Sequence, residues 1–237
     1  MFSVNILAFF IILLGIIFSV AYKKLTLIAA ITGGIIASLI FLSSGFTGIT
    51  MMAVFFILGS AATSWQLKTK QQQGLAEENK GTRTTVQVIA NAGVAALLSI
   101  CALIYPSDET IINITIAATF ASATADTLSS ELGNVYGRKF FNIITFKKDQ
   151  KGLNGVISLE GTLFGIAGSI VIATIYIIGF QQTIRELLFI IIAGTVGNVA
   201  DSIIGATLER KGLLKNDAVN FINTLIAALS MLLLQSI

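Results

Sequence analysis

The chain has 237 residues, of which 55% are hydrophobic and 11% are charged, with a net charge of +3 at neutral pH. Soluble domains carry about 25% charged residues, so this composition excludes a soluble globular domain and indicates a protein that crosses a membrane several times. The sequence has no histidine and one cysteine, Cys101, which excludes histidine catalysis, an intrachain disulfide and zinc sites built from these residues. Any bound metal must be held by oxygen atoms, which favours Mg²⁺ or another hard cation.

Eight apolar segments approach the roughly 20 residues that a membrane-spanning helix needs. They cover residues 4–21, 25–43, 46–63, 86–105, 111–129, 156–179, 185–206 and 218–236. We therefore predict an all-α fold, a polytopic transmembrane bundle of about eight spans that forms a single domain over 1–237. The first segment has no basic stretch ahead of it and is followed by Lys23 and Lys24, so we expect a retained first span rather than a signal peptide.

The positive charges predict an orientation. If the N-terminus lies outside, fourteen of the 15 lysines and arginines, Lys80 among them, fall in the inner connections and only Arg185 falls outside. This asymmetry is typical of multi-pass proteins with the basic loops in the cytoplasm. We expect both termini outside and, in a prokaryote, a location in the cell inner membrane. The polar inner connection 64–85 is interpreted as a plain cytoplasmic linker.

Polar side chains of the later spans gather at their inner ends. A carboxylate at membrane depth costs a few kcal/mol or more and by default marks a functional site. The candidate residues are Asn91, Asp126, Glu131, Asn154, Glu160, Asn198, Asp201 and Asp217. Together they predict an active-site cavity that opens on the cytoplasmic side. Glu131 stands about 140° around an ideal helix from Asp126, so both can face one ion only if the helix ends or bends between them.

A basic, glycine-containing connection, 147–155, leads into the sixth predicted span. Basic side chains and free N–H groups at a helix start are suited to binding phosphate. No G-x-x-x-x-G-K-[ST] motif occurs, which excludes a P-loop nucleotide site. Carboxylates that hold Mg²⁺ beside cations that hold phosphates indicate phosphoryl or nucleotidyl transfer onto a lipid, with donor and acceptor left open.

A cation-coupled transporter is an alternative, because A-D-T-L at 125–128 is echoed by A-D-S-I at 200–203 within apolar runs. Against this alternative, both units lie on spans that run in the same direction. The outer halves of the spans also offer no polar path.

Five motifs resemble one family of integral membrane proteins, whose plant member is the phytyl-phosphate kinase of tocopherol synthesis. They are K-G-T-R-T-T-V-Q-V-I-A-N-A-G (80–93), A-D-T-L-S-S-E-L-G (125–133), G-L-N-G-V-I-S-L-E-G-T (152–162), G-N-V-A-D-S-I-I-G-A-T-L-E (197–209) and N-D-A-V-N-F-I-N-T (216–224). The resemblance makes 80–224 the catalytic core and 1–63 three peripheral spans. It implies phosphorylation of an isoprenyl monophosphate to the diphosphate with CTP as donor. It also implies distant kinship with dolichol kinase and CDP-lipid synthases.

The resemblance also implies site residues. Asp126, Glu131, Glu160 and Asp201 would be the catalytic acidic residues, with Asp126, Glu131 and Asp201 as the ligands of Mg²⁺. Asn91, Asn154, Asn198 and Asp217 would be polar partners of the nucleotide or substrate. Our own candidates for phosphate contacts are Arg83, Arg138, Lys148 and Lys151.

The expected partners are a nucleotide, an isoprenoid lipid phosphate and membrane lipids, with no nucleic acid. A cytidylyltransferase that makes a CDP-lipid is the alternative enzyme, and the oligomeric state is left open.

Overall fold

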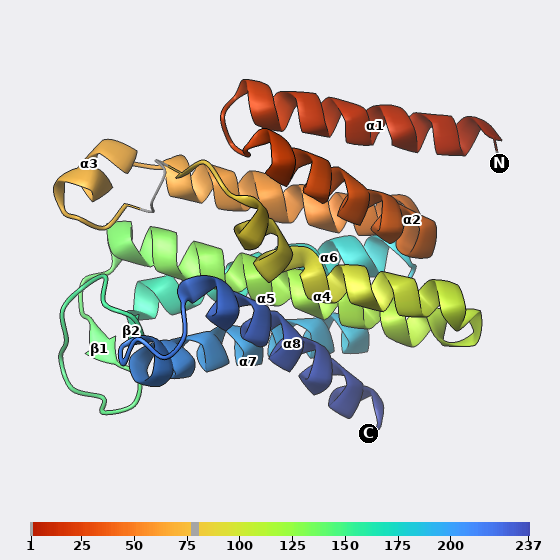
Figure 1. Cartoon of the computed structure of the whole chain (residues 1–237). Helices are drawn as coiled ribbons and strands as arrows, with labels where there is room; N and C mark the ends of the chain where they lie inside the picture. The colour runs from red at the N-terminus through yellow and green to blue at the C-terminus, as the bar shows by residue number, and fades with distance from the viewer. Residues whose placement is uncertain (1, 77–80) are drawn as a thin grey trace.

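The computed structural model describes residues 2–76 and 81–237, with side chains from residue 5 onward, so Lys80 lies outside the described residues. The helices are α1 (Phe2–Ala21), α2 (Leu27–Ser64), α3 (Leu67–Gln72), α4 (Thr85–Ile104), α5 (Glu109–Tyr136), α6 (Leu159–Gly179), α7 (Ile184–Ile204) and α8 (Asn216–Gln235). A 3₁₀ turn η2 (Pro106–Asp108) precedes α5, and a π-helical turn η3 (Gly205–Glu209) extends α7. The short strands β1 (Phe141–Asn142) and β2 (Val156–Ile157) pair antiparallel. The predicted all-α membrane bundle is confirmed (Figure 1).

Helix α2 is a hairpin of two antiparallel helices. Gly45 sits between its halves at φ 58° and ψ −150°, a conformation that favours glycine. A straight helix of 38 residues would hold its ends about 57 Å apart, yet Lys24 Nζ, just before the helix, donates a hydrogen bond of 2.6 Å to Ser64 Oγ at its end. Near the turn, Ser44 Oγ donates to Asn113 Oδ1 of α5 over 2.6 Å. The two predicted segments 25–43 and 46–63 are therefore separate crossings.

Six described helices are long and apolar enough to cross a membrane, and α1 is a shorter apolar helix. Because α2 crosses twice, these helices provide the eight predicted crossings. The first described residues and the C-terminus lie at one end of the bundle, while α3, β1 and β2 lie at the other (Figure 1). We call the end with α3, β1 and β2 the basic end, because the connections rich in lysine and arginine gather there. Its orientation toward the cytoplasm stays a prediction.

Helix α5 forms the centre of the bundle. It packs against α2, α4, α6, α7 and α8, and 89% of its most apolar stretch is buried, against at most 44% for the other spanning helices. Its Ala, Ser and Thr side chains are small enough to let neighbouring backbones approach. Glycines of α6 and α7 face it closely: a Cβ on Gly165 would lie 3.0 Å from the Ala125 carbonyl oxygen, and one on Gly197 would lie 2.1 Å from Ser122 Oγ.

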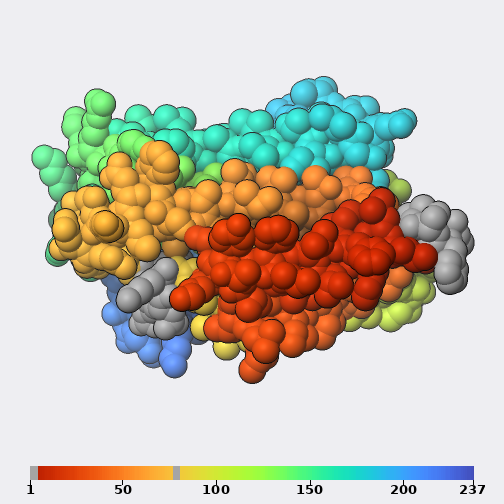
Figure 2. Space-filling view, turned by 90° about the horizontal axis from the view of Figure 1, so that it is seen from above, coloured from red at the N-terminus to blue at the C-terminus, as the bar shows by residue number. Residues whose placement is uncertain are grey.

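Helix α1 lies on the outside of the bundle, where it packs mainly on α2 (Figure 2). Its outward side chains are apolar and exposed: Phe9, Leu14 and Phe18 each expose more than half of their surface. This face has the composition expected of a surface against lipid tails.

Candidate active site

A polar cavity of about 380 Å³ opens at the basic end of the bundle. Its walls come from α4, α5, α7, α8 and the start of α6, and the connection around β2 covers one side. Of the residues expected from the sequence, seven line it: Arg83, Asn91, Asp126, Glu131, Asn154, Asn198 and Asp201. The structure thus brings together expected residues from three helices, α4, α5 and α7, and from two connections, as the inner-end pattern predicts.

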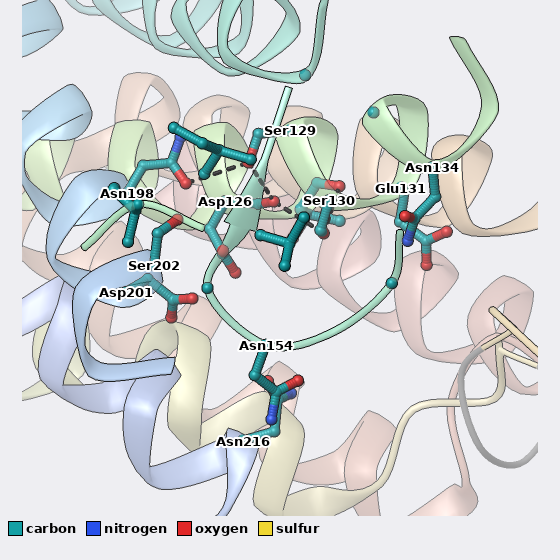
Figure 3. A pocket seen from close by; sticks show the side chains of 18 of the residues that line it. Asp126, Ser129, Ser130, Glu131, Asn134, Asn154, Asn198, Asp201, Ser202 and Asn216 are labelled. Atoms are coloured by element: carbon teal, nitrogen blue, oxygen red, sulfur yellow. Dashed lines mark hydrogen bonds between the residues drawn. The ribbon is translucent and has the colours of Figure 1, made fainter. Parts of the chain in front are cut away.

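Asp126 of α5 and Asp201 of α7 both point into this cavity (Figure 3). Their carboxyl groups lie within hydrogen-bonding range of each other. Two carboxylates at such separation repel one another unless a proton or a cation lies between them. The pair is therefore a place where positive charge is attracted.

A second set of side chains holds this pair in position. Asn223 Nδ2 donates a hydrogen bond of 2.9 Å to Asp201 Oδ1, and Ser122 Oγ in turn donates to Asn223 Oδ1 over 3.1 Å. On the α5 side, Ser129 Oγ donates to Asn198 Oδ1 over 3.1 Å (Figure 3). These bonds tie α5, α7 and α8 together beside the carboxylates, and they fix the orientation of Asp201.

Two amide oxygens of the cavity wall have no hydrogen-bond partner in the described residues, Asn91 Oδ1 of α4 and Asn220 Oδ1 of α8. Both side chains are buried. Asn91 Nδ2 is satisfied by the Gln87 carbonyl oxygen over 2.9 Å, which leaves its oxygen as the open acceptor. Buried polar atoms almost always have a partner, so these two oxygens are suited to contacting a cation or a donor group of a ligand.

Glu131 is turned away from the Asp126–Asp201 pair. Helix α5 continues unbroken to Tyr136, so the condition that both acids could face one ion is not met. Glu131 instead forms an ion pair with Lys70 of α3, and the two residues are only 5% and 2% exposed. Lys70 Nζ also donates to the carbonyl oxygens of Ala62 and Thr63 over 3.0 and 2.8 Å.

The interpretation of 64–85 as a plain linker is therefore wrong for its first part. Residues 64–72 fold back onto the end of the bundle, because the ammonium of Lys70 satisfies the last carbonyls of α2 and the buried carboxylate of Glu131. Burying a carboxylate is tolerated when such a cation neutralises it.

The expected metal ligands Asp126, Glu131 and Asp201 do not form one compact cluster. In the described residues, no three or more Asp, Glu or Cys side chains stand close enough together to hold a metal ion. The donor set that remains consists of the Asp126 and Asp201 carboxylates and the open oxygens of Asn91 and Asn220. Such an all-oxygen set fits Mg²⁺ in chemistry, since Mg²⁺ in phosphate-binding sites takes one or two carboxylates and completes its shell with other oxygens.

Residues 152–158 line one side of the cavity, from the connection between β1 and β2 through β2 to the N-cap of α6. Arg210, just after η3, fastens this loop: its Nε donates to the Asn154 carbonyl oxygen over 2.6 Å and its Nη2 to Asp149 Oδ2 over 2.8 Å. The backbone N–H of Gln150, and next the Arg210 guanidinium, hold the pKa of Asp149 below its ordinary value. These two hydrogen bonds hold the loop between β1 and β2 against the end of α7.

Arg83 stands where the cavity meets the α2 hairpin. It is 7% exposed, and its guanidinium lies 5.4 Å from the centre of the Phe55 ring. Its backbone pairs with the start of α2 through Arg83 N to the Lys24 carbonyl oxygen at 2.9 Å. A buried arginine that lines a polar cavity supplies fixed positive charge for an anionic ligand.

The other expected residues lie outside the cavity lining. Glu160 faces Arg138, with 4.0 Å between the carboxylate and Nε, and the Arg138 side chain is 89% exposed. Lys148 is exposed on the loop, and Lys151 Nζ donates to Gln73 Oε1 over 3.2 Å. Asp217 stands in the first turn of α8, where a carboxylate is favourable to the helix dipole.

Sequence reasoning missed Lys70, and it did not single out Asn220 and Asn223. Nothing in the sequence marks Lys70 as a site residue, because a short polar stretch does not reveal which distant carboxylate its lysine contacts. The sequence does point to Asn220 and Asn223, because they lie in the motif at 216–224 and one turn apart, on the same face of α8.

The bundle and its cavity define an integral membrane protein with a carboxylate site at one end. Residues 10–228 match the family described as integral membrane protein DUF92, so the chain belongs to that family. The match begins within α1, so it includes the first three spans that the motifs at 80–224 left out.

Three relatives show how far this likeness extends. The chain is 34% identical over 197 residues to Protein VTE6, chloroplastic, of Arabidopsis thaliana, a match that covers 81% of this chain and 59% of that protein. It is 32% identical over 197 residues to an uncharacterized membrane protein of Synechocystis, covering 82% of this chain and 76% of the relative. It is 35% identical over 185 residues to another of Methanocaldococcus jannaschii, covering 78% and 75%. No solved structure matches the chain.

Proposed function

We propose that this protein is a membrane kinase that phosphorylates an isoprenyl monophosphate to the diphosphate with a nucleoside triphosphate, CTP in first place, and Mg²⁺. The observation that carries the proposal is the pair of carboxylates, Asp126 and Asp201, at the polar end of an otherwise apolar bundle. The family match supports it, because the motifs resemble those of the plant phytyl-phosphate kinase.

In the proposed reaction, a terminal oxygen of the isoprenyl monophosphate attacks the γ-phosphorus of the nucleotide. A new P–O–P bond forms, the bond between the γ-phosphorus and the β–γ bridging oxygen breaks, and the nucleoside diphosphate leaves with the electron pair. The attacking phosphate is already anionic, so the step needs no strong base. Positioning and charge neutralisation then provide most of the catalysis.

The chain's own residues have matching roles in this proposal. Asp126 and Asp201, with the open oxygens of Asn91 and Asn220, would hold the divalent cation. A bound Mg²⁺ would neutralise charge on the transferring phosphoryl group. Arg83 would bind a phosphate, and backbone N–H groups of 152–158 would contact the nucleotide at the cavity mouth. Asn223 keeps the Asp201 carboxylate in one orientation.

The test is turnover by the purified protein in detergent or nanodiscs. Geranylgeranyl or phytyl phosphate with CTP and Mg²⁺ should yield the diphosphate, followed by ³¹P NMR. Asp126→Asn and Asp201→Asn should each lower kcat at least about 100-fold, because each removes charge where the transition state needs it. Asp108→Asn is the matched control, since Asp108 is an exposed carboxylate of η2 that lies outside the cavity lining.

The phosphorus products separate the two enzyme reactions. A kinase releases the nucleoside diphosphate, whereas a cytidylyltransferase releases pyrophosphate and leaves CMP on the lipid. Thermal unfolding with CTP, ATP, GTP and UTP, with and without Mg²⁺, identifies the donor by its stabilisation of the folded state. An inactive wild type across several prenyl phosphates and all four nucleotides would count against the proposal.

A further inference from the structure

A second, apolar groove of about 170 Å³ lies between α1, the α2 hairpin and α4. Its walls are apolar except for Ser19, Arg83, Gln87 and Asn91. The hydroxyl of Ser19 is satisfied by the Ile16 carbonyl oxygen over 2.9 Å, so it adds no open polar group. The interior of this groove thus suits a hydrocarbon ligand and no polar one.

The groove and the polar cavity share one stretch of wall. Arg83, Gln87 and Asn91 line both spaces. Arg83 contacts both spaces. Its guanidinium lies over the ring of Phe55, which lines the groove, and the same side chain lines the polar cavity. A ligand with an anionic head and an apolar tail would find complementary surroundings on the two sides of this stretch.

Two glycines keep the groove open. A Cβ on Gly15 of α1 or on Gly33 of α2 would meet nothing within 4 Å, although neither residue has a positive φ that would require glycine. By contrast, a Cβ on Gly34 would lie 2.5 Å from Ile16 Cδ1, so Gly34 serves the contact between α1 and α2. A glycine inside a helix is destabilising relative to alanine, because it loses more backbone freedom on folding. Gly15 and Gly33 therefore leave room for something other than the protein.

The groove also has a direction. Its wall on α1 runs from Ser19, near the basic end, to Ile11, which is about 12 Å along the helix. A tail that starts at Arg83 would thus extend from the site toward the middle of the bilayer, parallel to the lipid chains of the same leaflet.

We propose that this groove binds the isoprenyl tail of the lipid phosphate, with the phosphate at Arg83 and the tail between α1, α2 and α4. The proposal rests on the proposed function, since it places the acceptor of that reaction. It makes the first three spans part of the substrate site, and it makes groove length a determinant of prenyl chain length.

The test replaces a glycine of the groove wall by a larger residue and measures the kinetics with prenyl phosphates of increasing length. Gly33→Leu should raise KM for geranylgeranyl phosphate at least about tenfold, the effect of displacing two or more buried methylenes. With dimethylallyl phosphate, kcat/KM should change less than about twofold, as for a surface substitution. Ala61→Leu is the matched control, because it adds similar bulk to an exposed position of α2 away from the groove.

Gly33→Ala and Gly15→Val keep the test decisive if Gly33→Leu folds poorly, since each adds less bulk to the same open space. An equal rise of KM for every chain length, or no change in any groove variant while the wild type turns over, would overturn the inference and leave the proposed kinase standing.

A diazirine-bearing isoprenyl phosphate tests the groove without any turnover. Labelling within 11–56 that geranylgeranyl phosphate suppresses, and phosphatidylcholine does not, supports the inference even if the reaction assigned above is wrong. Labelling that phosphatidylcholine alone suppresses would mean that an ordinary bilayer lipid occupies the groove, and it would refute the inference.

Discussion

The ammonium of Lys70 is the most deeply buried charge that the described part of the chain places at the basic end. It joins three elements: α3, which carries it, the end of α2, whose carbonyls accept from it, and α5, whose Glu131 pairs with it. A buried pair contributes little net stability as a pair, but removing one partner strands the other charge.

We predict that Lys70→Met lowers the free energy of unfolding by about 3–5 kcal/mol, because Glu131 is left buried without a counter-charge. Thermal unfolding of the purified protein in one detergent would measure the change. Lys68→Met is the matched control, since Lys68 lies on the same short helix and is exposed.

Replacing both partners should be milder than replacing one. The double variant Lys70→Met/Glu131→Gln is expected to recover part of the loss, because no net charge remains buried. Equal stability of Lys70→Met and Lys68→Met would show that the pair does not support the fold.

For single residues, the sequence predicts which charged side chains lie within membrane spans, but not which residues they pair with. Asp126, Asn198 and Asp201 could be placed in one cavity because each lies at an inner span end. Glu131 was expected to share an ion with Asp126 only if α5 ended or bent between them, and in the unbroken helix it pairs with Lys70 of α3 instead. Lys148 and Lys151 looked like phosphate ligands, but the loop lines the cavity only from Gly152 onward and both lysines lie outside the lining.

Among the elements, α5, α7 and α8 pack very closely where they cross beside the site. A Cβ on Gly197 would lie 2.1 Å from Ser122 Oγ and 2.8 Å from the Asn223 carbonyl oxygen. Ser122 and Asn223 are the residues that lead to Asp201 through hydrogen bonds. Packing and site geometry are therefore coupled through this one glycine.

Two glycine-to-alanine substitutions should act in opposite directions. Gly197→Ala is expected to cost about 1–3 kcal/mol by overpacking and to lower turnover, since Asn223 must shift. Gly33→Ala should stabilise α2 by up to about 1 kcal/mol, because its methyl group meets open space. Thermal unfolding of the two variants side by side measures both effects. Destabilisation by Gly33→Ala would mean that the space beside α2 is already filled.

The elements themselves were largely predictable, because apolar length is a strong signal in a membrane protein. Each of the eight segments contains a helix, although 156–179 begins with β2 and is helical only from Leu159. The segments 25–43 and 46–63 meet at Gly45 in a turn too tight to leave a loop. The folded-back stretch at 64–72 was not predictable, since nothing apolar marks it and its contacts are distant in sequence.

For the whole molecule, the even number of crossings places the two ends of the chain at one face and the cavity at the other (Figure 1). The cavity's lining residues lie near the basic end, where cations of four connections gather. The charge asymmetry therefore predicts which compartment the cavity faces.

Cysteine labelling in intact cells tests this orientation. In a Cys101→Ser background, we expect Ser107→Cys, in the turn between α4 and α5, to react with a membrane-impermeant maleimide. Lys147→Cys at the basic end should react only after the membrane is opened. Both positions are exposed, so accessibility of the protein surface is matched. The reverse pattern would place the cavity outside the cell.

The central position of α5 has a consequence for how the protein is made. Its most apolar stretch has a mean hydropathy of only 1.3, against 1.7–2.1 for the other spanning helices. During synthesis α5 leaves the ribosome after α2 and α4 but before α6, α7 and α8. At that stage only α2 and α4 can cover its hydroxyl-rich surface, and the faces that later contact α6, α7 and α8 are still uncovered. Insertion of α5 thus depends on companions on both sides, and the helix that bears Asp126 becomes stable in the bilayer only once the last three spans have arrived.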